Sequence, residues 1–301
     1  MIIKNTVCVI INPVSGTKSK RNIPHYFNKL ASLGYDVEIF KTEYAGHATD
    51  IASEAVKNNV KYVIAVGGDG TINEIAKALI GSNTILGILA VGSGNGLARS
   101  LHIPMDKNKA VEIIEQGNVR EIDYGLVNEH IFLCTCGVGF DAQVSEKSLN
   151  QKNRGILMYV KNMIDTFLHF KSEKYKIITP THTFEEEAFV LTCANATQYG
   201  NNAFIAPRAS MEDGLMNIVI LKPLSAWNVP KIAIQMFSQN IGNSRKLIQI
   251  IAPEVTILRE HEGVMHMDGN AVYAGKEINI KIIHRGLKVL APSLSSNKKW
   301  I

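Results

Sequence analysis

The chain has 301 residues, of which 46% are hydrophobic and 20% charged, so it can bury a large core and is long enough for one large domain or two ordinary ones. Its net charge of +5 favours an anionic ligand or an acidic membrane surface but is too small to indicate a nucleic-acid-binding protein. No apolar run is long enough to span a membrane, and four cysteines in apolar runs, without a CxxC pair, are typical of reduced thiols in a cytoplasmic protein.

The first part of the chain alternates between strand and helix patterns. We predict strands at residues 6–13, 35–42, 62–66 and 84–92, and helices at 23–34, 48–59, 71–79, 97–102 and 105–117. Such alternation is typical of βαβ units, in which helices cover both faces of a parallel sheet. The sequence therefore predicts an α/β domain with a parallel sheet over residues 1–123.

From about Ile122 onward, strand patterns predominate. We predict strands at residues 121–128, 130–139, 185–196, 215–222, 255–260 and 277–283, and two helices near 154–171 and 225–240. This pattern indicates a β-rich second domain, an antiparallel sandwich, over residues 124–301, and it leaves open whether the extreme C-terminus packs back on the first domain. Because no long linker is present, we expect the two domains to pack as one rigid unit, with a site in their cleft.

The most informative stretch is Gly67-Gly68-Asp69-Gly70-Thr71, which follows a short β-branched run and precedes a helix pattern. Its glycines let the backbone approach a ligand closely, and a helix N-terminus beyond such a loop favours a phosphate. Asp69 would repel phosphate unless a cation lay between them, and Mg²⁺ is the natural choice. Thr71 and Glu74 form a capping-box pattern, which predicts a helix start near Thr71. An ordinary turn with a solvated Asp69 is the alternative.

Two further glycine-rich loops follow predicted strands, Asn12 to Gly16 and Gly92 to Gly96. Either could be a plain turn by itself, but loops that follow parallel strands converge at one sheet edge, where α/β proteins bind ligands. The basic residues 18–21 are typical of a solvated face. The GxGxxA match at residues 137–142 lacks a following helix pattern, and we interpret it as a turn.

Two Asp-Gly pairs stand out in the second half, Asp213-Gly214 and Asp268-Gly269. Each precedes an alternating strand pattern, and taken singly each predicts a hairpin turn.

Together, these motifs in this order resemble the diacylglycerol kinase catalytic family of lipid kinases, which includes sphingosine and ceramide kinases. The likeness continues through residues 194–221, which look like the metal-loop region of that family, to Asp268-Gly269, and so covers nearly the whole chain. The resemblance implies a nucleotide-binding first domain, a β-sandwich second domain, and ATP in the cleft between them.

The resemblance also assigns roles to individual residues. Those that would contact ATP are Asn12, Pro13, Val14, Ser15, Gly16, Thr42, Gly67, Gly68, Asp69, Gly70, Thr71, Ile72, Asn73 and Ser93. Asp69 would connect the nucleotide phosphates to the metal network, and Asp213 would hold Mg²⁺ with backbone oxygens of Ser210 and Leu215. These roles agree with the general demand of phosphoryl transfer for positioning and charge neutralisation.

One departure concerns the late turn, where the family usually has Asp-Gly-Glu and both acids are implicated in proton transfer. This chain has Asp268-Gly269-Asn270, and Asn cannot accept a proton at neutral pH. Either Asp268 is the base alone, or catalysis is weakened, or the chain is an inactive version.

We therefore expect an ATP- and Mg²⁺-dependent kinase that phosphorylates a lipid hydroxyl such as that of diacylglycerol, with Asp268, Asn270 and Asp69 at the catalytic centre. We expect a cytoplasmic protein in peripheral contact with an anionic membrane surface, without a nucleic-acid partner, and leave open a homodimer. The alternatives are a kinase of sphingoid bases or other lipid alcohols, a NAD kinase, and a nucleotide-binding protein with impaired catalysis. The loops at Asn12 and Gly92 argue against a NAD kinase, although that group shares Gly-Gly-Asp-Gly-Thr.

Overall fold

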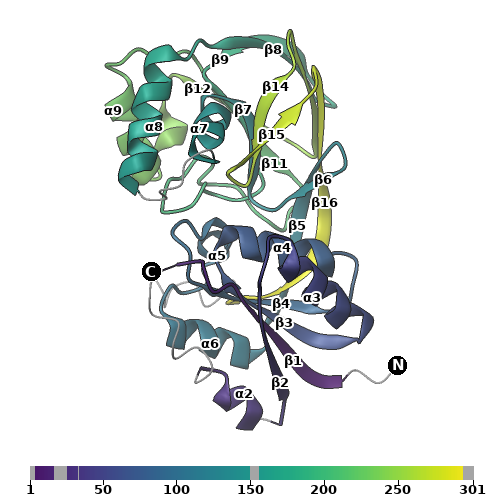
Figure 1. Cartoon of the computed structure of the whole chain (residues 1–301). Helices are drawn as coiled ribbons and strands as arrows, with labels where there is room; N and C mark the ends of the chain where they lie inside the picture. Colours follow the sequence, from purple (N-terminus) through teal and green to yellow (C-terminus); the bar gives the residue numbers. More distant parts are fainter. Residues whose placement is uncertain (1–3, 17–25, 33, 150–155, 294–301) are drawn as a thin grey trace. The chain divides into compact units, whose positions relative to one another are not determined.

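The computed structural model of the chain describes residues 4–16, 26–32, 34–149 and 156–293 (Figure 1). The chain divides into two compact units, residues 1–122 with 285–301 (unit 1) and residues 123–284 (unit 2). The predicted basic face at 18–21, the start of the helix predicted at 23–34, its residue Leu33, and positions 154–155 of the helix predicted at 154–171 lie outside the described residues.

Unit 1 contains a parallel sheet in the order β2-β1-β3-β4 (Figure 1). Its elements are β1 (Lys4–Ile11), α2 (Asn28–Ser32), β2 (Asp36–Lys41), α3 (His47–Lys57), β3 (Val60–Gly67), α4 (Asp69–Leu79), β4 (Ile85–Ala90), α5 (Gly96–Ser100) and α6 (Lys107–Gln116). Val289, near the end of the chain, lies parallel to Leu86 of β4 and extends the sheet.

The central strand β3 shows why its sequence is apolar throughout. Residues 63–66 are fully buried, because α3 and α4 cover one face of the sheet while α2 and α6 lie on the other (Figure 1). The prediction of a doubly covered parallel sheet is confirmed.

Unit 2 is built mainly of antiparallel strands and three longer helices. Its elements are β5 (Val119–Val127), β6 (His130–Phe132), β7 (Thr135–Gly139), α7 (Phe140–Leu149), α8 (Ile156–His169), β8 (Glu173–Ile178), β9 (Thr183–Ala188), β10 (Val190–Ala194), β11 (Met216–Leu221), α9 (Val229–Phe237), the short 3-10 helix η1 (Ile241–Asn243), β12 (Leu247–Ala252), β13 (Glu254–Arg259), β14 (Gly263–Met267), β15 (Asn270–Ala274) and β16 (Glu277–Leu290). β5 and β16 carry the chain across the boundary between the units.

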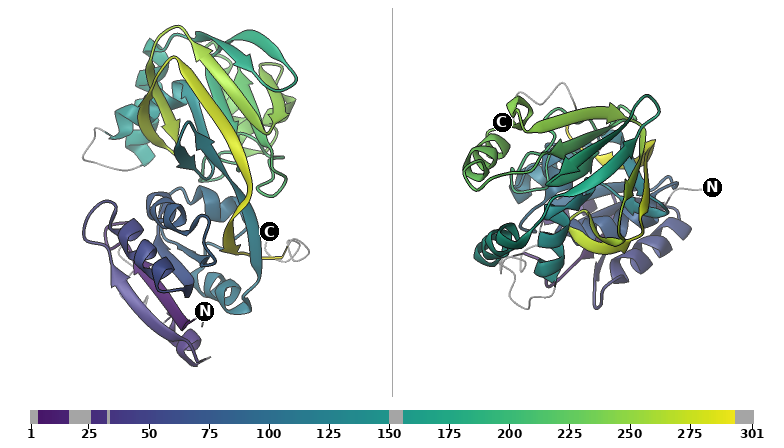
Figure 2. Two further views of the ribbon diagram at one scale, coloured as in Figure 1. Left: turned by 90° about the vertical axis from the view of Figure 1, so that its right-hand side faces the viewer. Right: turned by 90° about the horizontal axis from the view of Figure 1, so that it is seen from above.

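Two sheets of unit 2 enclose its main core. One has the order β16-β13-β8-β9 and the other β12-β11-β10-β7-β14-β15; β5 pairs with β16, the long yellow strand of Figure 2. The core between them contains residues of both sheets, among them Leu191, Ile218 and Ile257. A second core on the outer face of the six-stranded sheet includes Val190 and, on α9, Ile232. The predicted antiparallel sandwich is thus confirmed.

Several local predictions were wrong. α4 begins at Asp69, its N-cap is Gly68, and no side chain caps it, so the capping box of Thr71 and Glu74 does not form. A helix, α7, begins at Phe140, within the GxGxxA match at residues 137–142, so the predicted turn there is wrong. The strand predicted at 185–196 is two strands, β9 and β10, and β8 and β12 were not predicted.

The two Asp-Gly pairs behave differently. Asp268 and Gly269 form a two-residue hairpin between β14 and β15, where Met267 pairs with Asn270, and both have positive φ, 49° and 79°. The hairpin predicted at Asp213 is wrong, because β11 pairs with the distant strands β10 and β12 instead.

All four cysteines are buried and none forms a disulfide, as predicted. Burial raises the pKa of the Cys8 thiol to about 12, so this thiol is unreactive at neutral pH. None of the helices in the described ranges combines the length and the apolar character that crossing a membrane requires.

Candidate active site

Three loops meet at the carboxyl ends of β1, β3 and β4 in unit 1. The backbone amide of Asn12 donates to the carbonyl of Val66 (3.0 Å), and that of Val91 donates to the carbonyl of Gly67 (2.9 Å). These bonds hold the ends of the three strands level with one another. The structure thus confirms that the three glycine-rich loops converge at one edge of the sheet.

Glycine is required where these loops touch. A Cβ added at Gly92 would lie 2.6 Å from the Cα of Gly68, closer than side chains tolerate. Gly16 has a φ of 76°, and a Cβ there would overlap the carbonyl oxygen of Val91. The loops therefore pack backbone against backbone, which leaves their amide groups near one another at the start of α4.

Asn12 connects the first loop to the second. Its side-chain amide donates to the hydroxyl of Thr71 (2.9 Å), while its Oδ1 accepts from the backbone of Val14 (3.0 Å). The amide of Thr42, at the end of β2, donates to the carbonyl of Ile11 (2.9 Å). Of the residues predicted to contact ATP, the structure thus brings Asn12, Thr42 and Thr71 to the same sheet edge.

Asp69 connects the second loop to the third. Its Oδ2 accepts from the amide of Asn95 and its Oδ1 from that of Gly96, both at 2.7 Å. Asp69 is therefore not merely a solvated residue: it closes the turn from Gly92 to Gly96. A carboxylate has about four lone-pair positions, so these bonds leave acceptor capacity for a cation or a water molecule.

A hollow of about 250 Å³ lies beside the third loop. It is lined by Ala90, Val91, Gly92, Asn95, Arg99, Met105 and Lys107. The side-chain oxygen of Asn95 is buried without a hydrogen-bond partner among the described residues. The two cationic side chains of this hollow, Arg99 and Lys107, fit part of an anionic ligand such as a nucleotide.

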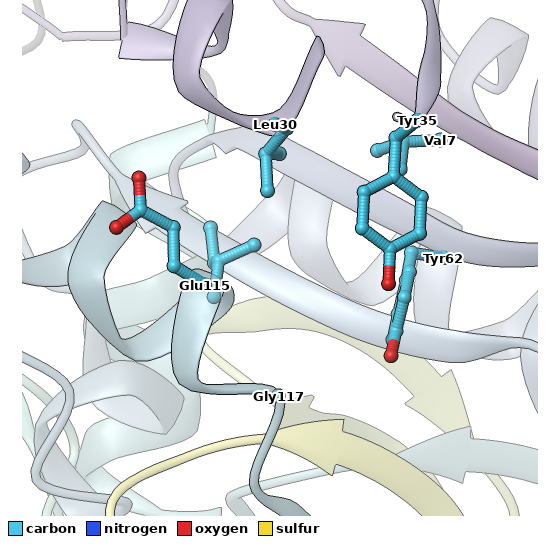
Figure 3. A pocket seen from close by; sticks show the side chains of 7 residues that line it. Val7, Leu30, Tyr35, Tyr62, Glu115 and Gly117 are labelled. Carbon is cyan, nitrogen blue, oxygen red and sulfur yellow. The ribbon is translucent and has the colours of Figure 1, made fainter. Parts of the chain in front are cut away.

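Figure 3 shows another cavity of unit 1, with a volume of about 20 Å³, between Leu30, Tyr35, Tyr62 and Glu115. Tyr35 directly precedes β2 and Tyr62 lies near the start of β3, so this cavity is at the opposite edge of the sheet from the loops. It has room for about one water molecule. We assign it no role in the site.

The turn around Asp213 in unit 2 is held by a residue that the sequence analysis missed, Asp123. The carboxylate of Asp123 is fully buried; its Oδ2 accepts from the amide of Gly214 (2.7 Å), and its Oδ1 lies 2.9 Å from Nδ1 of His284. Its own amide donates to the carbonyl of Met211 (2.6 Å). No clear signal in the sequence marked Asp123, because the same strand also carries Arg120 and Glu121 and nothing in the pattern distinguishes the buried acid from the other.

The three predicted metal ligands lie on this turn. The hydroxyl of Ser210 accepts from the amide of Glu212 (3.2 Å), and Oδ1 of the exposed Asp213 accepts from the amide of Leu215 (3.0 Å). No group of three His, Cys, Asp or Glu side chains within the described ranges could hold a metal ion. One carboxylate with backbone carbonyls and water still fits a hard cation such as Mg²⁺, because oxygen ligands of this kind are what it prefers.

Asp268 is bound by a row of backbone amides. Its carboxylate accepts from Leu133 (2.7 Å), Cys134 (2.7 Å) and Thr135 (3.0 Å), and its own amide donates to the carbonyl of Thr135 (2.8 Å). Both oxygens are thus engaged, and any proton that Asp268 accepts must use the remaining lone pairs. Asn270, by contrast, is exposed at the first position of β15.

A second residue that the sequence analysis missed, Asn195, connects the two turns of unit 2. Its side-chain amide donates to the carbonyls of Asp123 (3.0 Å) and Leu133 (2.8 Å). Because Asp123 binds the Asp213 turn and the amide of Leu133 binds Asp268, one hydrogen-bond network includes both turns. Oδ1 of Asn195 is buried and has no partner among the described residues.

A further network fixes β14 just before Asp268. Oδ2 of Asp141, on α7, accepts from the hydroxyls of Thr192 (2.7 Å) and Tyr199 (2.8 Å), and lies 2.9 Å from Nε2 of the buried His266. Burial alone would raise the pKa of Asp141, but the attraction and hydrogen bonds from these three side chains outweigh it and lower the pKa. Because the sequence pattern at residues 137–142 predicts a turn rather than a helix, Asp141 was not identified as a site residue.

The remaining predicted nucleotide residues surround the same loops of unit 1. Pro13, Val14 and Ser15 are in the first loop, Gly70, Ile72 and Asn73 in the first turns of α4, and Ser93 in the third loop. Val14 is 88% exposed, whereas Ile72 and Asn73 are buried, so Ile72 contributes packing and its backbone rather than an accessible side chain. Every predicted site residue thus lies either at the three loops of unit 1 or at the Asp213 and Asp268 turns of unit 2.

Two family models match this chain, one over each of its two parts. Residues 6–127 match the model of the diacylglycerol kinase catalytic domain, and residues 134–291 match that of the YegS C-terminal NAD kinase beta sandwich-like domain. Proteins named diacylglycerol kinase from two Staphylococcus aureus strains, bovine RF122 / ET3-1 and MRSA252, are each 27% identical over 299 residues, covering 97% of this chain and 94% of theirs.

Solved structures show the same fold. Two structures from Bacillus anthracis str. Sterne, the second titled a diacylglycerol kinase, have TM-scores of 0.78 and 0.73, are both 20% identical, and cover 97% of this chain and 97% and 98% of theirs. The second family model covers more than half of the chain, and the two together include the glycine loops, the Asp213 turn and Asp268. The chain therefore belongs to the diacylglycerol kinase family of lipid kinases.

Proposed function

We propose that this kinase transfers the γ-phosphate of ATP to the hydroxyl of diacylglycerol with the help of Mg²⁺. In this proposal residues 1–123 bind the nucleotide, and residues 124–301 bind the metal and the lipid. The observation that carries it is the convergence of three glycine loops around the N-terminus of α4, with Asp69 bound to the third loop at 2.7 Å.

The loops of unit 1 would position the phosphates. Their backbone amides and the first turn of α4, where amides lack intrahelical acceptors, favour phosphate oxygens. Asn12 and Asp69 keep the three loops together, through Thr71 and the amides of Asn95 and Gly96. This arrangement supports nucleotide binding because phosphoryl transfer depends on fixed donors more than on covalent chemistry by the protein.

The Asp213 turn would hold Mg²⁺. Asp213 would supply a carboxylate oxygen, and Ser210 and Leu215 backbone carbonyls, while the buried Asp123 keeps the turn in place through Gly214. When bound, the ion would neutralise phosphate charge.

Asp268 would accept the proton of the lipid hydroxyl. Its three amide donors hold its carboxylate in one orientation, which is what a general base requires, although they also occupy both oxygens. Asn270 cannot share this task, so Asp268 would act without a second acid in the turn.

The test is transfer of ³²P from ATP to a panel of diacylglycerol, sphingosine, ceramide, a monoalkyl glycerol and NAD, with and without Mg²⁺. We expect labelled phosphatidic acid only when Mg²⁺ is present. If sphingosine or ceramide were labelled instead, the substrate would be another lipid alcohol and not diacylglycerol. Labelled NAD would identify a NAD kinase. ATP binding by calorimetry without transfer to any acceptor would favour a nucleotide-binding protein with impaired catalysis, as the exposed Asn270 would allow.

A further inference from the structure

Helix α9 of unit 2 is apolar on two opposite sides. Ile232 is buried and Met236 partly buried in the core beneath the helix, on the face toward the six-stranded sheet. Ile234 and Phe237, which helical spacing places on the other side, are 68% and 62% exposed. A helix that is apolar all round normally has a partner on each side. The outer side of α9 has none within the described chain, and α9 lies at the border of unit 2 (Figure 1).

Trp227 extends this apolar surface. It directly precedes the helix and is 92% exposed, the most exposed large apolar side chain among the described residues. Lys231, also exposed, is three residues before Ile234 and thus on the same side of the helix. We call Trp227, Lys231, Ile234 and Phe237 the outer face of α9.

The charge around this face is of one sign. Residues 215–253 contain no Asp or Glu but four cationic residues, Lys222, Lys231, Arg245 and Lys246. Lys222 pairs with Glu186 (3.3 Å), whereas the other three are exposed and form no ion pair with a described residue. Arg245 and Lys246 follow η1, which directly succeeds α9 and shares its core through Ile241.

We propose that the outer face of α9 docks this enzyme on an anionic lipid bilayer. Exposed indole and aliphatic side chains beside unpaired cations match the headgroup region, where Trp resides at the boundary and Lys and Arg contact anionic lipid. A second copy of the chain fits less well, because a symmetric pairing of this face would bring its cations together. The inference rests on the proposed function, since a bilayer-dissolved substrate gives the enzyme a reason to dock.

The first experiment uses Trp227 itself as the probe. The chain has two tryptophans, and Trp300→Phe leaves Trp227 as the only one. On addition of phosphatidylglycerol vesicles, its emission should shift to shorter wavelength and be quenched by spin-labelled lipid chains. An unchanged emission while the protein sediments with the vesicles would show that another surface docks, and would overturn the proposal.

Variants then test each part of the face. Trp227→Ser and the double variant Ile234→Ser with Phe237→Ser should each weaken vesicle binding about tenfold or more, because each removes apolar area from the interface. Tyr273→Ser is the matched control, since Tyr273 is 76% exposed on β15, at the other edge of the six-stranded sheet from β12. It should bind as the wild type does. Equal binding by all of these variants would refute the assignment.

The role of the cationic side chains is tested by the dependence of vesicle binding on lipid charge and on salt. Lys231→Glu with Arg245→Glu should abolish the preference for phosphatidylglycerol over phosphatidylcholine vesicles and the loss of binding in high salt. Melting temperatures without lipid should stay at the wild-type value for every variant, which shows that folding is intact. If ultracentrifugation showed a dimer and Phe237→Ser dissociated it, the partner of this face would be a second copy of the chain and not a bilayer, and the proposal would be overturned.

Phosphorylation of detergent-dispersed diacylglycerol separates this inference from the proposed function. If the protein phosphorylated detergent-dispersed diacylglycerol but did not bind vesicles, the docking proposal would be wrong and the proposed function would stand. Vesicle binding through Trp227 without phosphorylation of any lipid would overturn the proposed function alone.

Discussion

Replacing Asp268 by Asn tests whether this carboxylate is a base or a structural anchor. In the structure Oδ1 accepts from Cys134 and Thr135, and Oδ2 from Leu133. An amide side chain can retain the first two bonds, but its NH₂ group then faces the amide of Leu133. That unsatisfied donor and the loss of charge in the other two bonds together cost about 3 kcal/mol in unfolding free energy. Backbone strain adds nothing, because Asn tolerates the φ of 49°.

A loss of that size lowers the melting temperature by roughly 6–12 °C in a domain of this length. If Asp268 is also the base, kcat of the folded variant at low temperature should fall about 10²–10⁴-fold with little change in ATP affinity. Asp36→Asn, at the exposed start of β2, is the control for a generic loss of charge. A destabilised variant with wild-type kcat would refute the base, and an unchanged melting temperature would refute the hydrogen-bond argument.

Three other substitutions have distinct expected outcomes. Asn270→Glu should raise lipid phosphorylation and leave ATP affinity unchanged, because it adds a carboxylate at an exposed position beside the hairpin; an equal rate would leave the hairpin a structural role only. Asp69→Ala should abolish ³²P transfer and also lower the unfolding free energy by about 3 kcal/mol, because two charge-assisted hydrogen bonds are lost; undiminished turnover would remove Asp69 from the mechanism. Asp141→Asn should destabilise the protein at neutral pH. Because the folded-state pKa of Asp141 is lowered, this stabilisation is present above the ordinary value of 3.8 and disappears as the pH falls through the folded-state pKa. Denaturant titrations across acidic pH measure the difference, and a difference independent of pH would contradict the argument.

Local sequence was sufficient wherever backbone conformation alone decided the structure. The run at residues 63–66 predicted a doubly covered strand because burial on both faces excludes polar side chains. Asp268-Gly269 predicted a two-residue hairpin because both positions require positive φ. The glycine loops predicted one convergent edge because parallel strands all end there. α7 was missed because its buried positions, such as Ala142 and Val144, are too few and too small to form a recognisable apolar stripe.

The partners of the polar side chains were decided only by the tertiary structure. Thr71 matched a capping box, yet its hydroxyl accepts from Asn12, which is 59 residues away, and the helix starts at Asp69 instead. Asp69 was predicted beside phosphate and metal, and Asp268 in a hairpin turn and as the base, but in the structure each binds backbone amides of a loop distant in sequence. A carboxylate satisfies whichever donors folding brings to it, and nothing in the neighbouring residues specifies them. The sequence thus determined which backbone loops approach one another, and the fold determined which acids hold those loops in place.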